Sequence, residues 1–394
     1  MMPSSNCLPH VVHISGDFPD CIDDHKTPVI RTLVDTTAEQ FAHYVYSLNR
    51  CTPSLARFAR SSMNVQALIE STSFSHGQAV KYHAPPKGLF HKTMLDRVAR
   101  WIIQDIEARG AKPDIVIGHK LTIEGIVAEH VARRLGLPFA ISIQGDSDTK
   151  ILSARRDLSG AFAKVFHGAE VVFPFAPWAL KAVEGRLGLR SGPSVMLPCP
   201  TDIDKPTPPR SGNGSLVSVF HLKNARRKNL DGIAAASRYL AERGRVVPIS
   251  IIGGGSDVDR ATCDKLIGQA SGVSLTGPMD RASLRAFLPN ASGFVMPSRR
   301  ESFGLVFIEA LFCGLPIIYP KGAGVAGFLD GAPFALPVDA QDPQAIAEAM
   351  QHLIDHEVKL KHALAEWQAS ADASRFMRAS IAEAFASGLK QALT

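Results

Sequence analysis

Short apolar runs rich in β-branched residues alternate with longer stretches of helical spacing, and this alternation restricts the fold more than any other feature of the chain. In the first half the apolar runs are residues 10–14, 114–117, 139–143 and 170–173. The helical stretches between them are residues 31–49, 92–109, 123–135 and 177–187. Strand, helix and strand in regular succession predict a parallel sheet with helices on both faces.

A proline-rich segment, residues 197–215, interrupts this pattern, which then starts again. The length of 394 residues fits two or three domains. We therefore predict an α/β protein of two doubly wound, Rossmann-like domains, residues 1–200 and 201–374, that face a central cleft. A last helix, about residues 375–394, is expected to pack back on the first domain. The proline-rich segment is the predicted hinge, and the cleft is the expected binding site.

Composition excludes several classes of protein. Hydrophobic residues make up 45% of the chain and charged residues 20%, which is typical of a soluble globular protein and not of a disordered one. No apolar run is long enough to cross a membrane, and the first ten residues do not have the pattern of a secretory signal. The six cysteines form no CxxC pair, so we expect free thiols in the cytoplasm and no zinc site.

Positive charge is concentrated between residues 50 and 100, where eight Lys or Arg side chains face two acidic ones. A solvated basic surface is one interpretation. The other is a surface for an acidic partner, and the aromatic residues Phe58, Phe90 and Trp101 favour peripheral contact with an anionic membrane. We expect no nucleic-acid partner, because the net charge of the whole chain is only +6.

The stretch from residue 296 to residue 324 contains the most chemistry. A predicted strand is followed by a turn, by Ser302 as a possible helix N-cap, and by a short helix that ends at Gly314. The N–H groups of Phe303, Gly304 and Leu305 would open this helix without intrahelical acceptors. Such a helix start is a site for a phosphate or another anion.

Two carboxylates flank this helix start. Glu301 precedes it and Glu309 lies one turn inside, about 6 Å further along the axis than Leu305. That offset suits a sugar hydroxyl beyond a phosphate. A carboxylate inside an otherwise apolar helix is costly unless hydroxyls or amides satisfy it, so Glu309 is a candidate ligand-binding residue.

These residues lie within the segment PSRRESFGLVFIEALFCGLP, which resembles the E-x7-E signature of the retaining glycosyltransferases of family 4 (glycosyl transferases group 1) with the GT-B fold. HLKNARRKN is similar to the segment that opens the second domain in that family, with Lys228 at the position of the family lysine and Lys223 where an arginine is usual. DIVIGHKLTIEG matches the strand that ends in a histidine, here His119. The glycine-rich turn after the first strand is reduced to Gly16.

The resemblance implies a metal-independent hexosyltransferase that moves a sugar, with retention, from a UDP- or GDP-sugar to a saccharide or lipid-linked acceptor. Cell-surface polysaccharide or glycolipid synthesis would be its setting. Lys228, Glu301 and His119 would be the catalytic residues. No cofactor is implied. The residues implied for donor binding are Gly16, Lys223, Arg227, Gly277, Pro278, Met279, Phe303, Gly304, Leu305 and Glu309.

Other functions remain open from the sequence. A catalytically inactive sugar-nucleotide-binding module and an epimerase of the GT-B fold share the same residues. A phosphorylase would need a longer chain, and a nicotinamide oxidoreductase would need a third glycine in the Gly253-Gly254-Gly255 turn. The Asp-x-Asp triplets at 146, 202 and 257 lack the strand context of a metal site, so we expect no metal.

Overall fold

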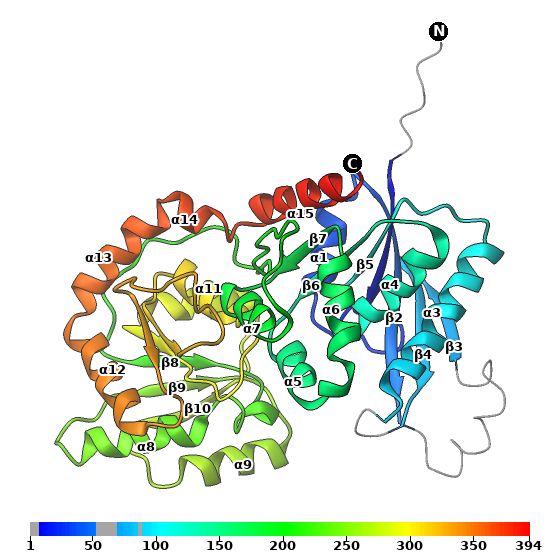
Figure 1. The fold of residues 1–394 in the computed structure, drawn as a ribbon. Helices are drawn as coiled ribbons and strands as arrows, with labels where there is room; N and C mark the ends of the chain where they lie inside the picture. The colour runs from blue at the N-terminus through cyan, green and yellow to red at the C-terminus, as the bar shows by residue number, and fades with distance from the viewer. Residues whose placement is uncertain (1–7, 53–68, 86–88) are drawn as a thin grey trace. The chain divides into compact units, whose positions relative to one another are not determined.

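The computed structural model describes residues 8–52, 69–85 and 89–394. The chain divides into two compact units. The N-terminal unit comprises the chain up to Phe175, Ala179–Pro200 and Arg378–Thr394, and the C-terminal unit comprises Ala176–Trp178 and Thr201–Met377. Each unit has its own sheet, mainly or entirely parallel, with helices on both faces, so the predicted doubly wound α/β architecture is confirmed (Figure 1).

The N-terminal unit is built on a seven-stranded sheet in the order β3-β4-β2-β1-β5-β6-β7. All neighbouring strands are parallel except β3, which runs antiparallel to β4. Its strands are β1 (His10–Ser15), β2 (Ala42–Cys51), β3 (Ile69–Phe74), β4 (Gly77–His83), β5 (Ile115–Gly118), β6 (Phe139–Ile143) and β7 (Val171–Pro174). Its helices are α1 (Val29–Thr36), α3 (His91–Ala108), α4 (Glu124–Leu135), α5 (Asp146–Ala154), α6 (Ser159–Gly168), most of α7 (Pro177–Leu187) and α15 (Arg378–Ala392).

The C-terminal unit has a six-stranded sheet, entirely parallel, in the order β10-β9-β8-β11-β12-β13. Its strands are β8 (Leu216–Val219), β9 (Ile249–Ile252), β10 (Val273–Gly277), β11 (Gly293–Val295), β12 (Ile317–Pro320) and β13 (Ala335–Val338). Its helices are α8 (Leu230–Ala241), α9 (Asp257–Ile267), α10 (Arg281–Phe287), α11 (Leu305–Phe312), α12 (Pro343–Asp355), α13 (Glu357–Gln368) and α14 (Ala371–Ser374).

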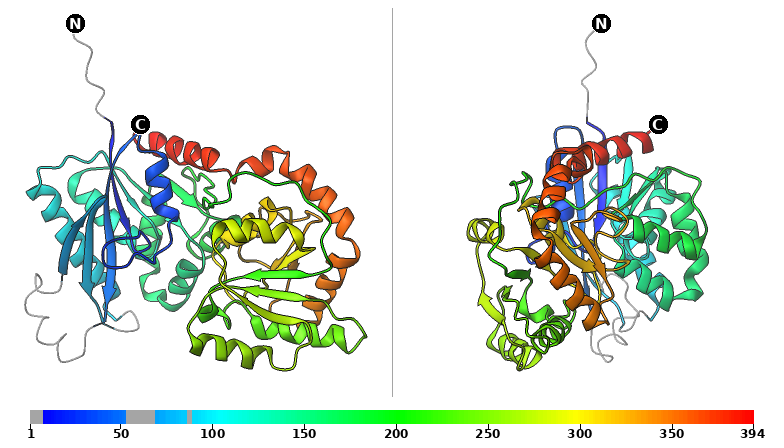
Figure 2. Two further views of the ribbon diagram at one scale, coloured as in Figure 1. Left: turned by 180° about the vertical axis from the view of Figure 1, so that it is seen from behind. Right: turned by 90° about the vertical axis from the view of Figure 1, so that its left-hand side faces the viewer.

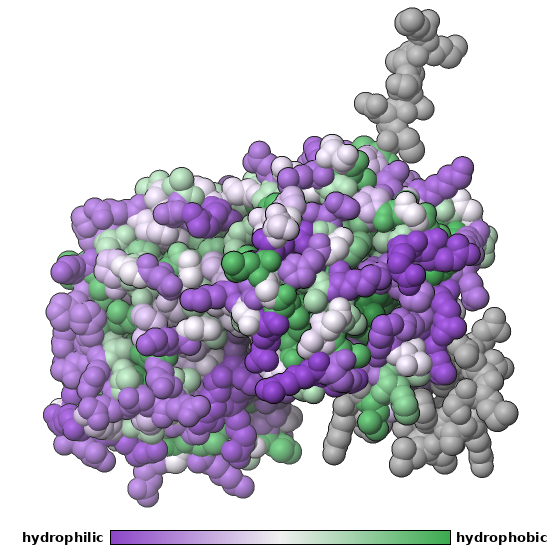
Figure 3. Space-filling view, viewed as in Figure 1, coloured by the Kyte–Doolittle hydropathy of each residue, from purple (hydrophilic) through white to green (hydrophobic). Residues whose placement is uncertain are grey.

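The central strands of both sheets are buried on both faces, which explains their continuous apolar runs. Ile14 of β1 and Ile117 of β5 are fully buried, as are Val217 of β8 and Phe294 of β11. The covering helices are amphipathic instead, and hydrophilic residues predominate on the surface formed by α8 and α9 (Figure 3). Within the described residues no helix combines the length and the apolar character that crossing a bilayer requires.

The last helix, α15, lies beside α1 and packs on β7 of the N-terminal unit (Figure 2). The contact is close, because a Cβ atom added to Gly388 would lie 2.4 Å from the ring of Phe173. The end of the chain therefore belongs to the N-terminal unit.

The sequence interpretation was wrong in one stretch of the N-terminal unit. Residues 31–49 are not one helix, because α1 ends at Thr36 and β2 begins at Ala42. In the described part of the basic segment, residues 50–100, the strands β3 and β4 precede the helix α3. Phe58, named above as an aromatic residue of this segment, lies outside the described residues, as do three of its basic residues, Arg57, Arg60 and Lys87.

Candidate active site

Lys228 and Glu301, 73 residues apart in the chain, form a buried ion pair in the C-terminal unit. Lys228 Nζ lies 2.5 Å from Glu301 Oε2, and each side chain is about nine-tenths buried. Lys228 follows β8 and Glu301 follows β11, and these two strands are parallel neighbours. The carboxyl ends of neighbouring parallel strands meet at one edge of the sheet, which is where ligands bind in this architecture.

Hydrogen bonds between the two loops hold this pair in place. Asn229 adopts the left-handed conformation, with φ of 65°, and its side-chain amide donates to Pro297 O at 3.0 Å and to Ala340 O at 2.7 Å. The Arg299 N–H donates to Arg227 O at 2.9 Å. Both sides of the Lys228–Glu301 pair are therefore fixed by backbone contacts rather than left to side-chain freedom.

The helix after Glu301 begins later than the sequence predicted. Ser302 is not its N-cap; Gly304 takes that position in the left-handed conformation, and α11 starts at Leu305. The N–H groups of Leu305 and Val306 have no backbone acceptor in the described chain, as at any helix start. The side chain of Phe303 is buried and its ring packs near Phe328. The anion site stays a prediction, and the helical N–H groups that would form it begin at Leu305, after Phe303.

Glu309 lies one turn into α11 and is half-buried. Burial raises the pKa of this carboxyl, while the nearby Arg281 guanidinium acts in the opposite direction. Its side chain makes no hydrogen bond or ion pair with another described residue. A half-buried carboxyl of this kind gains most from a ligand that donates hydrogen bonds to it.

The remaining predicted donor residues of the C-terminal unit lie at the same edge of its sheet. Lys223 and Arg227 are exposed in the segment between β8 and α8. Gly277 ends β10 with φ of 90°, and its carbonyl accepts from the Gly253 N–H at 3.0 Å. Pro278 and Met279 follow it. The roles of all these residues toward a donor stay predictions.

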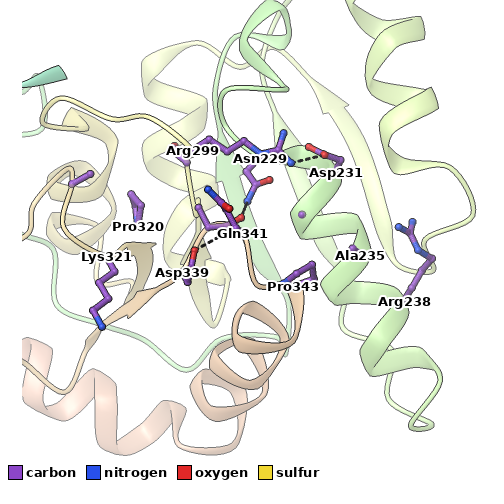
Figure 4. A pocket seen from close by; sticks show the side chains of 14 residues that line it. Asn229, Asp231, Ala235, Arg238, Arg299, Pro320, Lys321, Asp339, Gln341 and Pro343 are labelled. Carbon is purple, nitrogen blue, oxygen red and sulfur yellow. Dashed lines mark hydrogen bonds and ion pairs between the residues drawn. The ribbon is translucent and has the colours of Figure 1, made fainter. Parts of the chain in front are cut away.

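A cavity of about 870 Å³ lies next to the loops that carry Lys228 and Glu301 (Figure 4). Its wall includes the start of α8 and the segments that follow β11, β12 and β13. Figure 4 shows the Arg299 guanidinium paired with Asp231 on one side, at 2.6 Å, and Asp339 with Gln341 on another. Among the described residues that line it, none is a predicted donor contact. The cavity therefore lies beside the predicted donor-binding residues and is not the site at which they would bind a donor.

In the N-terminal unit, His119 is fully buried. Its Nε2 lies 2.9 Å from His13 Nδ1, and its Nδ1 lies 3.2 Å from Ser142 Oγ. Both ring nitrogens are therefore occupied inside this unit. The predicted contact with a donor sugar would require one of these two hydrogen bonds to open.

The contacts of His119 extend into a chain of three imidazoles. His13 Nε2 lies 2.9 Å from His43 Nδ1, and His43 Nε2 lies 3.0 Å from Thr37 Oγ1. The Thr37 hydroxyl donates to Leu33 O at 2.7 Å, so it must accept from His43. Each imidazole then carries its proton on Nε2 and accepts on Nδ1. Burial lowers the pKa of His119 to about 3 and that of His43 to about 4, which keeps the chain neutral.

Gly16, the predicted contact of the donor phosphate, already has a partner. Its N–H donates to Glu124 Oε1 at 2.6 Å, and the Glu124 carboxyl is fully buried. Burial raises the pKa of Glu124 to about 7, and Lys120, which is paired with Asp17 at 2.7 Å, acts in the opposite direction. Sequence reasoning missed Glu124, although a carboxylate inside the apolar stretch LTIEGIVA gives the same signal that singled out Glu309.

No three His, Cys, Asp or Glu side chains in the described ranges are grouped so that they could hold a metal ion. Two of the Asp-x-Asp carboxylates have local partners. Asp148 accepts from the Thr122 N–H at 2.9 Å, and Asp259 forms a capping box with Ser256 at the start of α9.

The imidazole chain predicts how stability depends on pH. The folded state keeps His13, His43 and His119 neutral below the ordinary histidine pKa of 6.5, whereas the unfolded chain binds protons there. The free energy of unfolding should therefore fall as the pH drops from about 6.5 toward 4, by about 1.4 kcal/mol per pH unit for each imidazole. Glu124 opposes this between its ordinary pKa of 4.5 and about 7.

Urea unfolding between pH 7.5 and 4.5 tests this expectation. His43→Gln should reduce the slope of the free energy of unfolding against pH by about 1.4 kcal/mol per pH unit, the contribution of one proton. The matched change His25→Gln should leave the slope as in the wild type, because His25 is exposed. Equal slopes for the wild type and His43→Gln would contradict the neutral chain.

Comparisons with known proteins find similarity in sequence over part of the chain. Residues 215–356 match the family model described as glycosyl transferases group 1. A D-inositol 3-phosphate glycosyltransferase of Corynebacterium urealyticum is 33% identical over 127 residues, 30% of each chain, and one of Jonesia denitrificans is 38% identical over 84 residues, 21% of this chain and 20% of the relative. The chain thus spans about three tenths or less of the length of these relatives.

Solved structures match over nearly the whole chain. Sucrose-phosphate synthase from Thermosynechococcus elongatus has a TM-score of 0.67 at 18% identity and covers 97% of this chain and 98% of its own. An α,α-trehalose-phosphate synthase (UDP-forming) from Burkholderia xenovorans, solved with glucose-6-phosphate, has a TM-score of 0.66 at 12% identity, covering 98% and 100%. At such identities the likeness shows the fold. The chain therefore has the GT-B fold, and its residues 215–356 are similar to the glycosyl transferases group 1 family.

Proposed function

We propose that this protein is a retaining, metal-independent hexosyltransferase that moves a sugar from a UDP- or GDP-sugar to a saccharide or lipid-linked acceptor. The observation that carries the proposal is the buried Lys228–Glu301 pair, held by two neighbouring loops directly before the open N–H groups of α11. Cell-surface polysaccharide or glycolipid synthesis in the cytoplasm is the setting we propose.

Donor binding would rearrange this pair. In the absence of a ligand, Glu301 is the counter-ion of Lys228. A diphosphate on the first N–H groups of α11 would replace it as the partner of Lys228 and leave the Glu301 carboxylate to accept from a sugar hydroxyl. Glu309, one turn further, would accept from the ribose hydroxyls.

Lys228 would then act mainly as the sugar–phosphate bond breaks. Negative charge develops on the departing diphosphate, and a fixed cation next to it stabilises the transition state more than the ground state. The family resemblance implies that the departing phosphate accepts the proton of the acceptor hydroxyl on the same face of the sugar, which gives retention. This step needs no protein nucleophile.

A ligand panel tests the proposal. The full chain is titrated with UDP-, GDP- and ADP-sugars and with NAD, and thermal unfolding is followed. A ligand at one hundred times its dissociation constant stabilises the folded state by about 2.7 kcal/mol. We expect one sugar nucleotide to raise the unfolding temperature, with EDTA making no difference, and NAD to leave it unchanged. Stabilisation by NAD alone would contradict the proposal.

Product analysis separates transfer from the alternatives. A transferase releases the nucleoside diphosphate only as an acceptor is extended, and the new linkage keeps the anomeric configuration of the donor. An epimerase would change the sugar without an acceptor, and a binding module would show neither reaction.

The anionic membrane surface expected across residues 50–100 stays a prediction. Of its described lysines, Lys81 pairs with Glu70 and Lys92 with Asp96.

A further inference from the structure

A second cavity, of about 500 Å³, lies within the N-terminal unit. It is enclosed by the carboxyl ends of β2 and β4, the start of α3, the residue before α4, and the end of α5. We call it the strand-end pocket and define it by Arg50, His91, Met94, Lys150, Ile151 and Arg155. β1, β2 and β4 are parallel, so the pocket is at the same edge of the sheet as Gly16. Its volume is that of a small-molecule site.

One wall of the strand-end pocket is apolar. Met94 and Leu95 of α3 are buried side chains, and Ile123 and Ile151 are partly exposed toward the space. Leu89, another lining residue, is 58% exposed. Such a lining offers few hydrogen-bonding groups to a sugar ring, but it removes apolar ligand surface from water.

The other wall is cationic. Three cationic side chains, Arg50, Lys150 and Arg155, line the pocket beside His91, and none of the described lining residues is acidic. Asp157, outside the lining, pairs with Arg155 at 2.6 Å. Burial lowers the pKa of His91, whose Nε2 donates to Thr122 O at 2.9 Å, so the positive charge of this wall comes from Arg50, Lys150 and Arg155. Lys150 is exposed and has no ion-pair partner among the described side chains. An anionic group is the chemistry that fits this wall.

We propose that the strand-end pocket binds an amphiphilic anion: a phosphate or similar group on the Arg50–Lys150 side, joined to an apolar chain on the Met94–Ile151 side. This rests on the proposed function only in taking that molecule to be the sugar acceptor. It narrows the acceptor from any saccharide to one whose anionic group is attached to an apolar portion, as in a lipid phosphate.

The chemistry of both walls must contribute, and a set of four probes separates them. Octyl phosphate carries both features, octyl β-glucoside only the chain, and inorganic phosphate and glucose 6-phosphate only the charge. Binding to the full-length protein is measured by isothermal titration at low and at physiological salt. We expect octyl phosphate to bind at least 10-fold more tightly than each of the other three, and more weakly as the salt concentration rises.

Two results would overturn the proposal. Equal affinity for inorganic phosphate or glucose 6-phosphate and octyl phosphate would mean that the pocket takes a free phosphate. Equal affinity for octyl β-glucoside would mean that the apolar wall alone accounts for binding.

Variants locate the binding. Lys150→Gln should weaken octyl phosphate about 3- to 10-fold, as expected for one lysine near an anion. Ile151→Ala should weaken octyl phosphate and leave inorganic phosphate unchanged, because only the apolar contact is reduced. The matched control Lys181→Gln removes an exposed lysine of α7 and should have no effect. Equal losses in Lys150→Gln and Lys181→Gln would place binding elsewhere and contradict the proposal.

The donor panel on the same proteins keeps the two proposals apart. If the wild type binds a sugar nucleotide but not octyl phosphate, the strand-end pocket proposal fails and the proposed function stands. If octyl phosphate binds and no sugar nucleotide does, the proposed function fails. The strand-end pocket still binds an amphiphilic anion, but that molecule can no longer be taken to be the sugar acceptor.

Discussion

Replacing Lys228 by alanine is expected to lower kcat by about 100- to 1000-fold, with a much smaller change in the donor KM. The size follows from removing one preorganised charge that stabilises a developing negative charge. Steady-state kinetics with the donor identified by the ligand panel measures it. Lys265→Ala, which removes an exposed lysine of α9, is the control and should keep wild-type kinetics.

A second variant is needed because Lys228→Ala leaves Glu301 buried without its partner, and breaking a buried pair in this way costs about 3–5 kcal/mol of stability. The double variant Lys228→Ala/Glu301→Ala removes both charges. Because Glu301 is itself assigned to the donor sugar, the double variant serves as a control for stability and not for activity. If Lys228→Ala is less stable than the double variant but still unfolds cooperatively well above the assay temperature, its loss of kcat belongs to the chemistry. If Lys228→Ala is unfolded at the assay temperature, the loss reflects misfolding.

Glu309 supplies the contrast. If it accepts from ribose hydroxyls in both the ground state and the transition state, Glu309→Ala should raise the donor KM and leave kcat nearly unchanged. Identical kinetic patterns for Lys228→Ala and Glu309→Ala would show that the roles are not divided in this way.

Gly304→Ala is expected to lower the free energy of unfolding through two separate costs. Gly304 has φ of 75°, and a Cβ atom there would lie 2.6 Å from the buried ring of Phe307. Left-handed backbone costs alanine about 1–2 kcal/mol, and the overlap adds about 1–3 kcal/mol. Donor binding should also weaken, because the start of α11 would move.

The matched control is Gly331→Ala. Gly331 has φ of 82° but no atom within 4 Å of its added Cβ, so this variant carries the backbone cost without the overlap. Urea unfolding should show a loss about twice as large or more for Gly304→Ala. Equal losses would mean that the Phe307 ring gives way and that the position tolerates a side chain.

The regular strands were predictable from the sequence because central parallel strands are buried on both faces and read as unbroken apolar runs. β2 was not. Its sequence, AHYVYSLNRC, mixes aromatic and polar residues, and it was read as the continuation of the helix that ends at Thr36. Its pairing with both β1 and β4 makes it a strand, and that pairing is a long-range property.

The sequence by itself predicted the two-unit α/β architecture, the resemblance to the glycosyl transferases group 1 family, and the candidate residues Lys228, Glu301 and Glu309, because these depend on local periodicity and on short motifs. Only the tertiary structure decided which of them meet. The adjacency of β8 and β11 brings Lys228 to Glu301, and the adjacency of β1 and β5 brings Glu124 to the Gly16 N–H. The order of strands in a sheet is set by packing between distant segments, so no local pattern in the chain records it.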